Sequence, residues 1–392
     1  MRVLVVNAGS SSIKIRLLGS DDSLLHRIDL RADRGRPDPG AVEAALAGLG
    51  EIDAVGHRIV HGGPVFGGPV RIDDGVLDQL EGLVELAPLH QPPALAAVRA
   101  TRDALPGVPA VACFDTAFHA GLPRCASTYA IPPRWHTEFG VRRYGFHGLA
   151  HEWAARRAAA LVGPRQRTVV AHLGSGASLC AVAWDGDFPR SLDTTMGFTP
   201  TAGLIMGSRS GDLDPAVPTW LIEHRGLSGA GVAAALDHES GLVGLTGTPD
   251  MRQVLAAEAA GRSDAVLAVQ MWLHRLRAGI AAMTAALGGV DVLVFGGGVG
   301  EHAETLRARA VDGLGFLGLA VDPGLNRDTA PRAEVDISAR HAPARTLVVH
   351  TREDLVIAGQ VRASLTPPGE HPSPPDTSAV GATPGRPSAA AH

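Results

Sequence analysis

Residues 3–14 read VLVVNAGSSSIK, an apolar strand followed by a tight turn of small residues and the start of a second strand. A distant stretch, residues 169–183, repeats this order as VVAHLGSGASLCAVA, and the Asp185-Gly186 dipeptide that follows is a hairpin signal. Small residues let backbone N–H groups approach an anion closely, and hydroxyl groups add further donors. The two stretches therefore predict a duplicated α/β domain with a phosphate-binding turn in each half.

Lys14 closes the first of these stretches, and it is the only lysine among the 35 basic residues of the chain. Lysine is a compact point charge and arginine is a broad planar fork, so a single retained ammonium indicates a position where arginine does not serve. An ammonium at the rim of a small-residue turn would supply charge to a polyphosphate. The alternative, a chance survivor in an ordinary hairpin, is left open by this residue alone.

The bulk composition limits the class of protein. A chain of 392 residues favours two domains, and the net charge of −5 argues against a nucleic-acid partner. The three cysteines lack C-x-x-C spacing, which predicts a reducing cytoplasm. The first apolar run is broken at Asn7 and the longer ones by charges, so we expect neither a signal peptide nor a membrane span.

Three further segments carry structural expectations. Residues 292–295 form an apolar strand that runs into Gly296-Gly297-Gly298-Val299-Gly300-Glu301, and a helix is expected over 302–311. Glu301 stands where a dinucleotide fingerprint needs its last glycine, so that motif is rejected, although a nucleotide can still lie over the turn. Apolar periodicity predicts a core-facing helix over 256–287, marked by Leu267, Met271, Leu273, Leu276, Ile280 and Met283. Residues 366–392 are rich in Pro, Gly, Ser and Ala, which predicts a disordered tail.

Arg, His and Asp gather beside Gly and Pro in the remaining motifs. They are HRIVHGG (57–63), LAPLH (86–90), FDTAFH (114–119), RYGFHG (143–148), TMGFTP (195–200) and GSRSGDLDP (207–215). In this order and spacing, and together with residues 7–14, the set resembles the acetate kinase family over residues 1 to about 365. The resemblance implies the superfamily of acetate and sugar kinases, Hsp70 and actin.

The implied fold is α/β, with two ribonuclease-H-like (actin-like ATPase) domains and the active site in the cleft between them. We expect the N-terminal domain over residues 1–119 plus 356–365, the nucleotide-binding domain over 120–355, and the tail over 366–392. The implied reaction is transfer of a phosphoryl group from ATP to acetate, giving acetyl phosphate and ADP, with Mg²⁺ as the metal and Mn²⁺ as an alternative. The family also implies a homodimer.

The charge of this reaction explains the arginines, because donor, acceptor and transferred group are all anionic. Guanidinium forks can hold such groups bidentately, and by resemblance Arg58 and Arg209 are the family's two catalytic arginines. His147 matches the histidine that donates a hydrogen bond to the transferred phosphoryl group, and Asp115 matches a catalytic carboxylate. Taken singly, each could be an ordinary ion-pair or structural residue.

The resemblance also assigns the metal and ligand contacts. Glu353 matches the magnesium-site glutamate, and Asn7 and Asp115 complete a hard-oxygen shell, although Glu353 could instead be a solvated residue at a helix start. His90, His119 and His151 have weaker claims, the first two as supporting groups. The expected acyl pocket is Val60, Leu89, Phe146 and Pro200, with Val60 setting its size. The expected ATP contacts are Lys14, His172, Gly174, Ser175, Gly176, Asp250, Met251, Arg252, Gly297, Gly298, Val299 and Gly300.

Some residues depart from the family pattern. Ser175 and His302 each stand where the family has Asn, which puts one phosphate contact and part of the adenine recognition in doubt. Gln91 replaces another Asn, and Leu149-Ala150 replaces Thr-Ser. Two alternatives stay open: a kinase for propionate or another short-chain acid, and a non-catalytic nucleotide-binding relative.

Overall fold

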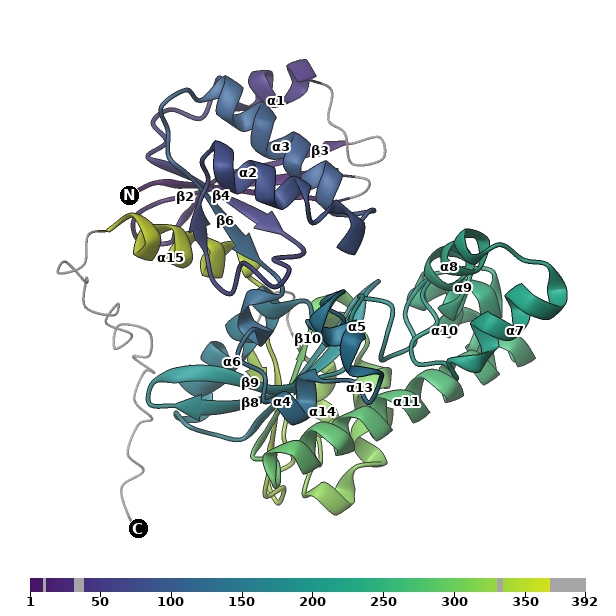
Figure 1. Cartoon of the computed structure of the whole chain (residues 1–392). Coiled ribbons are helices and arrows are strands. Elements are labelled where there is room, and N and C mark those ends of the chain that lie inside the picture. The colour runs from purple at the N-terminus through teal and green to yellow at the C-terminus, as the bar shows by residue number, and fades with distance from the viewer. Residues whose placement is uncertain (10–11, 32–38, 330–333, 367–392) are drawn as a thin grey trace, which may run out of the picture.

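The structure is a computed structural model that describes residues 1–9, 12–31, 39–329 and 334–366 (Figure 1). Its described strands form two six-stranded mixed sheets with helices packed against them. This arrangement confirms the predicted α/β class.

The first sheet contains the N-terminal hairpin and has the order β3-β2-β1-β4-β6-β5. Its strands are β1 (Val3–Ala8), β2 (Ser12–Leu18), β3 (Leu24–Arg31), β4 (Ala54–Ile59), β5 (Val70–Arg71) and β6 (Ala110–Phe114). β1 pairs antiparallel with β2, which confirms the predicted hairpin, while Ser10 and Ser11 of its turn lie outside the described residues. β1, β4 and β6 run parallel, so their carboxyl ends meet at one edge of the sheet.

The second sheet contains the repeated hairpin and has the order β11-β12-β10-β7-β8-β9. Its strands are β7 (Thr168–Leu173), β8 (Ala177–Asp185), β9 (Phe188–Thr194), β10 (Val292–Gly296), β11 (Val335–Asp336) and β12 (Arg345–Val348). β7 pairs antiparallel with β8, and the Asp185-Gly186 turn joins β8 to β9 as predicted. β7, β10 and β12 run parallel, so the turn after β7 lies beside the glycine-rich segment after β10.

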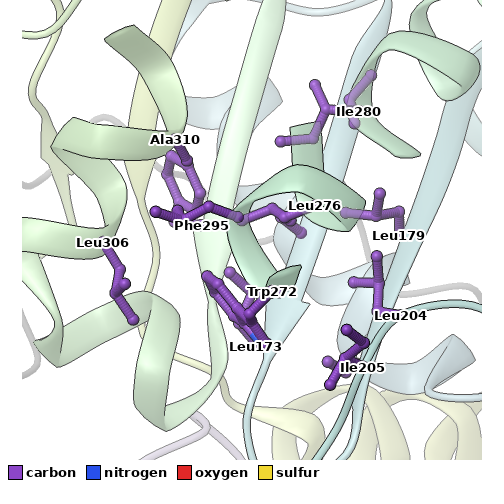
Figure 2. Close-up of a cluster of buried hydrophobic side chains, with 14 of the residues drawn as sticks. Leu173, Leu179, Leu204, Ile205, Trp272, Leu276, Ile280, Phe295, Leu306 and Ala310 are labelled. Carbon is purple, nitrogen blue, oxygen red and sulfur yellow. The ribbon is translucent and has the colours of Figure 1, made fainter. Parts of the chain in front are cut away.

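Helices cover both faces of each sheet (Figure 1). One face of the first sheet packs against α1 (Pro39–Leu46), α2 (Asp74–Glu81) and α3 (Gln91–Ala104), and the other against α15 (Glu353–Leu365). The second sheet lies between α6 (Gly148–Val162) and α11 (Ser263–Leu287). Figure 2 shows the α11 side of this core, where Trp272, Leu276 and Ile280 meet Leu179 and Phe295.

The remaining described helices are short or lie to one side of the second sheet (Figure 1). α7 (Ala216–Arg225), α8 (Gly229–His238), α9 (Gly241–Thr246) and α10 (Met251–Ala259) lie together at the far end of α11. The others are α4 (Arg124–Ser127), α5 (Pro133–Thr137), α12 (Gly297–His302), α13 (Glu304–Asp312), α14 (Pro323–Arg327), and the 3-10 helices η1 (Val84–Leu86), η2 (Ala117–His119) and η3 (Gly315–Leu317).

Two helix predictions were wrong in part. The helix predicted over 256–287 is interrupted after α10, where Gly261 has φ +79° and lets the chain turn before α11 begins. Its predicted core stripe holds from Leu273 onward, but Leu267 and Met271 are 52% and 38% exposed. The helix predicted over 302–311 is α13, and α12 already begins at Gly297.

Other expectations fall outside what the structure describes or tests. Residues 367–392 of the expected tail lie outside the described residues, and the proposed domain limits stay a prediction. Within the described part of the chain, none of the helices has the length and apolar character needed to cross a bilayer.

Candidate active site

A cavity of about 900 Å³ opens where the carboxyl ends of the two sheets face each other. From the predicted set it is lined by Asn7, Lys14, Arg58, His147, His172, Gly174, Ser175, Gly176, Gly297, Gly298 and Glu353. The structure therefore brings predicted metal, phosphate and catalytic residues from distant parts of the chain to one cleft.

Arg58 is the centre of the first half of this cleft. It is the last residue but one of β4, and its Nε and NH2 groups donate to both carboxylate oxygens of Asp115, at 2.8 and 2.5 Å. Its NH1 donates to the side-chain oxygen of Asn7 at 3.2 Å, and Glu353 lies 3.8 Å away. Burial lowers the pKa of Arg58, but the two carboxylates outweigh this effect and hold the pKa above its ordinary value. The guanidinium is thus fixed in place and fully charged.

Arg58 still has donors to offer a ligand. A guanidinium has five N–H groups, and these contacts use one each on Nε, NH1 and NH2. One N–H therefore remains on each terminal nitrogen, and both can donate to the oxygens of a carboxylate or phosphoryl group.

His147 occupies the start of α6 with an unusual backbone. Its φ is +57°, a left-handed conformation that is uncommon for a residue with a side chain and that is often found at functional sites. Its Nδ1 lies 2.9 Å from the Ser178 hydroxyl. Burial, followed by the nearby His172, His151, Arg58 and Arg209, lowers the pKa of His147 well below its usual value. The imidazole is therefore neutral at physiological pH and carries one N–H.

Gly176 lies between His147 and Arg209. A Cβ atom at this position would be 3.3 Å from His147 Nε2 and 3.5 Å from Arg209 NH1. A Cβ here would be tight against His147 and in ordinary contact with Arg209, so Gly176 lies directly between the two side chains and keeps that space open. Arg209 NH1 also donates to the Pro200 carbonyl oxygen at 3.3 Å, and burial lowers its pKa.

The predicted phosphate turn is tight and lies beside a second glycine turn. Gly174 N–H donates to the Gly176 carbonyl across the turn at 2.9 Å, and His172 and the exposed Ser175 flank it along the cleft. Gly297, with φ +74°, lies so close to the Leu173 backbone that a Cβ would sit 2.7 Å from its oxygen. Lys14, which pairs with Asn7 across the β1–β2 hairpin, lines the opposite wall.

The residues predicted for the acyl pocket are not among those that line the main cavity. Phe146 is fully buried in the apolar cluster around the second sheet. Val60, which follows β4 of the first sheet, packs against that cluster. Pro200 contacts Arg209 through its carbonyl, while Leu89 is 45% exposed before α3. Val60 and Phe146 therefore share one apolar cluster and Pro200 touches Arg209, while Leu89 lies outside both, and the acyl pocket stays a prediction.

The residues predicted for adenosine are also set back from the cavity. Asp250 caps α10 and pairs with the exposed Arg252 at 2.6 Å, and Met251 is buried. Their link to the phosphate turn is through Gly207, whose backbone lies against Pro249 and donates to the Ser175 carbonyl at 3.0 Å. Val299 and Gly300 lie on α12 and are not among the cavity-lining residues, unlike Gly297 and Gly298.

The donor set fits a hard divalent cation. Asn7, Asp115 and Glu353 offer amide and carboxylate oxygens around Arg58, and Mg²⁺ usually takes one or two protein carboxylates beside water and phosphate oxygens. Asp115 already gives both oxygens to Arg58, so Glu353 and Asn7 are the freer ligands. Within the described residues no group of three or more His, Cys, Asp or Glu forms a metal cluster of its own.

Sequence reasoning missed several groups in the cleft. Arg16 alternates with Lys14 along β2, and this period-two pattern could have signalled that both face one side of the sheet. Glu301 bonds the His350 ring at 2.6 Å and the Thr351 N–H at 3.0 Å, which joins the glycine segment to the start of α15. These contacts join residues about fifty positions apart, and no local pattern predicts them.

His119, which we predicted to be a supporting group, lies beside the backbone that leads into His147. It is fully buried, its Nε2 lies 3.0 Å from the Phe146 carbonyl and its Nδ1 lies 2.8 Å from the Ser191 hydroxyl. A carbonyl only accepts, so Nε2 carries the hydrogen. His119 therefore fixes the backbone immediately before His147.

Comparison with known proteins gives one consistent result. The sequence profile of the Acetokinase family matches residues 42–359. The acetate kinase of Leifsonia xyli subsp. xyli is 44% identical over 91% of this chain and 97% of its own length, and that of Deinococcus radiodurans is 41% identical over 91% and 96%. The crystal structure of Porphyromonas gingivalis acetate kinase has a TM-score of 0.84 at 37% identity, covering 93% of this chain and all of its own. A propionate kinase from Francisella tularensis also has a TM-score of 0.84, at 33% identity, covering 92% and 99%.

Proposed function

The chain belongs to the acetokinase family, and we propose that it transfers a phosphoryl group reversibly and directly from ATP to acetate, giving acetyl phosphate and ADP. The observation that carries the proposal is the convergence of Arg58, His147 and Arg209 on the phosphate turn around Gly176.

Neutralisation of charge is the main task of this site, because donor, acceptor and transferred group are all negative. We assign Arg58 and Arg209 to hold the acetate carboxylate and the oxygens of the transferred group. Asp115 and Asn7 keep Arg58 in position, which leaves one N–H on each of its terminal nitrogens for the ligand. Neutral His147 donates its N–H to the transferred group without adding a proton that would have to leave.

Mg²⁺ belongs to this proposal, with Mn²⁺ as an alternative. Glu353 and Asn7 would hold it, with Asp115 next to them. When bound, the cation would neutralise phosphate charge and orient the polyphosphate. Lys14, His172 and the turns at Gly174–Gly176 and Gly297–Gly300 would bind the phosphates. Asp250, Met251 and Arg252 would take the adenosine side.

The second candidate for the acceptor acid is propionate. Val60, Phe146, Pro200 and Leu89 would form the wall that meets the methyl group. One methylene in an apolar pocket changes binding by about 1–3 kcal/mol, so acids of neighbouring length compete. The similarity of the chain to a propionate kinase structure supports propionate as the alternative acceptor. A non-catalytic nucleotide-binding role is the weaker option, because Arg58, His147 and Arg209 are all retained.

We also propose that the chain forms a homodimer in the cytoplasm. Exposed apolar side chains gather on and beside α7, where Val217, Trp220 and Ile222 are 37–45% exposed. None of the described residues of α7 is buried within the chain, so its apolar face suits burial against a second copy. Light scattering of the purified protein tests this state.

A single assay tests the proposed reaction. The purified protein is incubated with ATP, Mg²⁺ and formate, acetate, propionate or butyrate, and ADP formation is coupled to an optical signal. Highest kcat/KM with acetate supports the proposal, and highest kcat/KM with propionate selects the alternative. ATP binding without turnover of any acid would leave the non-catalytic role.

A further inference from the structure

The Ser178 hydroxyl lies between two histidine rings. It is 2.9 Å from His147 Nδ1 and 2.8 Å from His151 Nε2. The two histidines are one turn apart on α6, where the His151 N–H donates to the His147 carbonyl, and Ser178 is on β8 of the adjoining sheet. Ser178 and His151 are fully buried and neither lines the cleft, so they contact His147 from behind.

The other nitrogen of His151 decides where the hydrogens are. His151 Nδ1 is buried and has no hydrogen-bond partner. A buried N–H without an acceptor is costly and rare, whereas a lone pair without a donor is tolerated more often. His151 is also neutral, because burial and then the nearby His119 and His172 lower its pKa well below the usual value. The single hydrogen of its ring is therefore on Nε2, which points at Ser178.

This placement sets the direction of both hydrogen bonds. His151 Nε2–H donates to the Ser178 oxygen. Among the described residues, the only other group at hydrogen-bonding distance from that hydroxyl is His147 Nδ1. The Ser178 O–H therefore donates to His147 Nδ1, which must be bare. A neutral imidazole has one hydrogen, so in His147 it is on Nε2.

We propose that Ser178 and His151 are positioning residues that hold His147 in the tautomer with its hydrogen on Nε2, the nitrogen that faces the phosphate turn. The Cε1–Nε2 edge of His147 faces Gly176, because a Cβ on that glycine would lie 3.3 Å from each of these two atoms. The two hydrogen bonds from His151 to Ser178 and from Ser178 to His147, which we call the relay, therefore present a donor to the transferred phosphoryl group. The opposite polarity would present a lone pair to phosphoryl oxygens, which is repulsive, and would bury an unpaired N–H on His151.

The inference rests on the proposed role of His147, but its test does not need turnover. Nitrogen-15 spectra of the protein labelled at histidine distinguish the two tautomers by which ring nitrogen bears hydrogen. The His147 signals are assigned by their loss in His147→Gln. We expect Nε2–H for both His147 and His151 in the unmodified protein. Nδ1–H on His147 would overturn the proposal, even if no variant at Ser178 or His151 folds.

Matched substitutions test the relay by removing its parts. Ser178→Ala removes the donor to His147, and His151→Phe removes the donor to Ser178. In each, we expect a mixture of His147 tautomers and kcat lowered about tenfold, the scale of one hydrogen bond, with little change in KM for ATP or acetate. His151→Gln places an amide N–H where His151 Nε2–H was, so it should restore the Nε2–H signal and most of kcat.

Ser191→Ala is the control for loss of a buried hydroxyl. Ser191 is on the neighbouring strand β9 and bonds His119 Nδ1 at 2.8 Å, so its removal frees a histidine nitrogen in the same way without touching His147. Its thermal stability should fall as in Ser178→Ala while the His147 tautomer is unchanged. An equal tautomer shift in both variants, or an unshifted tautomer with normal kcat in Ser178→Ala, would overturn the relay. Correct tautomers with no dependence of turnover on His147 would instead contradict its proposed catalytic role.

Discussion

Replacement of Arg58 by Ala should damage both catalysis and stability, and the structure separates the two effects. Arg58 gives two hydrogen bonds to Asp115, whose side chain is only 1% exposed. Removing the guanidinium leaves a buried carboxylate without its partner, which typically costs 3–5 kcal/mol. This is a large part of the roughly 5–15 kcal/mol that holds a typical domain together. Loss of the Arg58 guanidinium, which we assign to hold the anionic ligands, should also lower kcat about 100-fold or more.

The double variant Arg58→Ala with Asp115→Asn isolates the stability effect. An amide in place of the carboxylate removes the unpaired charge, so most of the lost free energy of unfolding should return. Turnover should not return, because the ligand-facing N–H groups are still absent. Asp115→Asn alone should cost less stability than Arg58→Ala, because Arg58 is 18% exposed and keeps Glu353 at 3.8 Å.

Urea denaturation and steady-state kinetics of the four proteins measure these effects. Arg99→Ala is the control, because its ion pair with Glu81 has both side chains about half exposed and should contribute about 1 kcal/mol or less. The reasoning is refuted if Arg58→Ala unfolds at the wild-type urea concentration, or if the double variant recovers turnover along with stability.

Four other outcomes follow from the same cleft. Lys14→Arg should lower kcat/KM for ATP despite keeping the charge, since a planar head replaces a compact one opposite Asn7, and an unchanged value would make Lys14 a chance survivor. Val60→Ala should raise the propionate-to-acetate ratio of kcat/KM roughly fivefold, the equivalent of about 1 kcal/mol, and a constant ratio would remove Val60 from the acyl wall. Ser175→Asn should tighten ATP binding in a titration if the exposed side chain reaches a phosphate, and a neutral result would mean that the turn has adapted to Ser. Burial lowers the pKa of His57 to about 3, so between about pH 6.5 and pH 3 only the unfolded chain binds a proton at this residue. The free energy of unfolding should therefore decrease as the pH is lowered through this range, by up to about 1.4 kcal/mol per pH unit for His57. Denaturation curves in which His57→Gln keeps the full wild-type dependence on pH would contradict this.

The sequence was most informative where chemistry and strand ends coincide. Both hairpins, the strand before Gly296 and the Asp185-Gly186 turn could be predicted because each depends on a few neighbouring residues. The helix over 256–287 was wrong at Gly261 because its apolar spacing continues through a break that only backbone conformation reveals. Leu267 and Met271 fit the periodic stripe, yet the stripe alone could not tell which turns of α11 extend past the sheet.

Contacts between distant residues lay beyond the sequence. Ser178 has the same small-residue surroundings as several other serines, and nothing local indicates that it touches two histidines of α6. The same holds for Arg58, which lies with its partners Asn7 and Asp115 at the ends of three parallel strands. The resemblance could name the residues, but only the meeting of strand ends shows that Asp115 holds Arg58 and so acts through it.

One hydrogen bond joins these arrangements into a single unit. The Gly148 N–H, at the start of α6, donates to the Asp115 carbonyl at 2.9 Å. The side chain of Asp115 therefore fixes Arg58 while its backbone fixes the residue after His147, whose left-handed conformation aims the ring at the phosphate turn. The Arg58 side of the cleft and the His147 side are consequently aligned through one buried residue. A substitution at Asp115 should therefore disturb Arg58, whose bonds come from the side chain, whereas the main-chain bond to Gly148 beside His147 is kept.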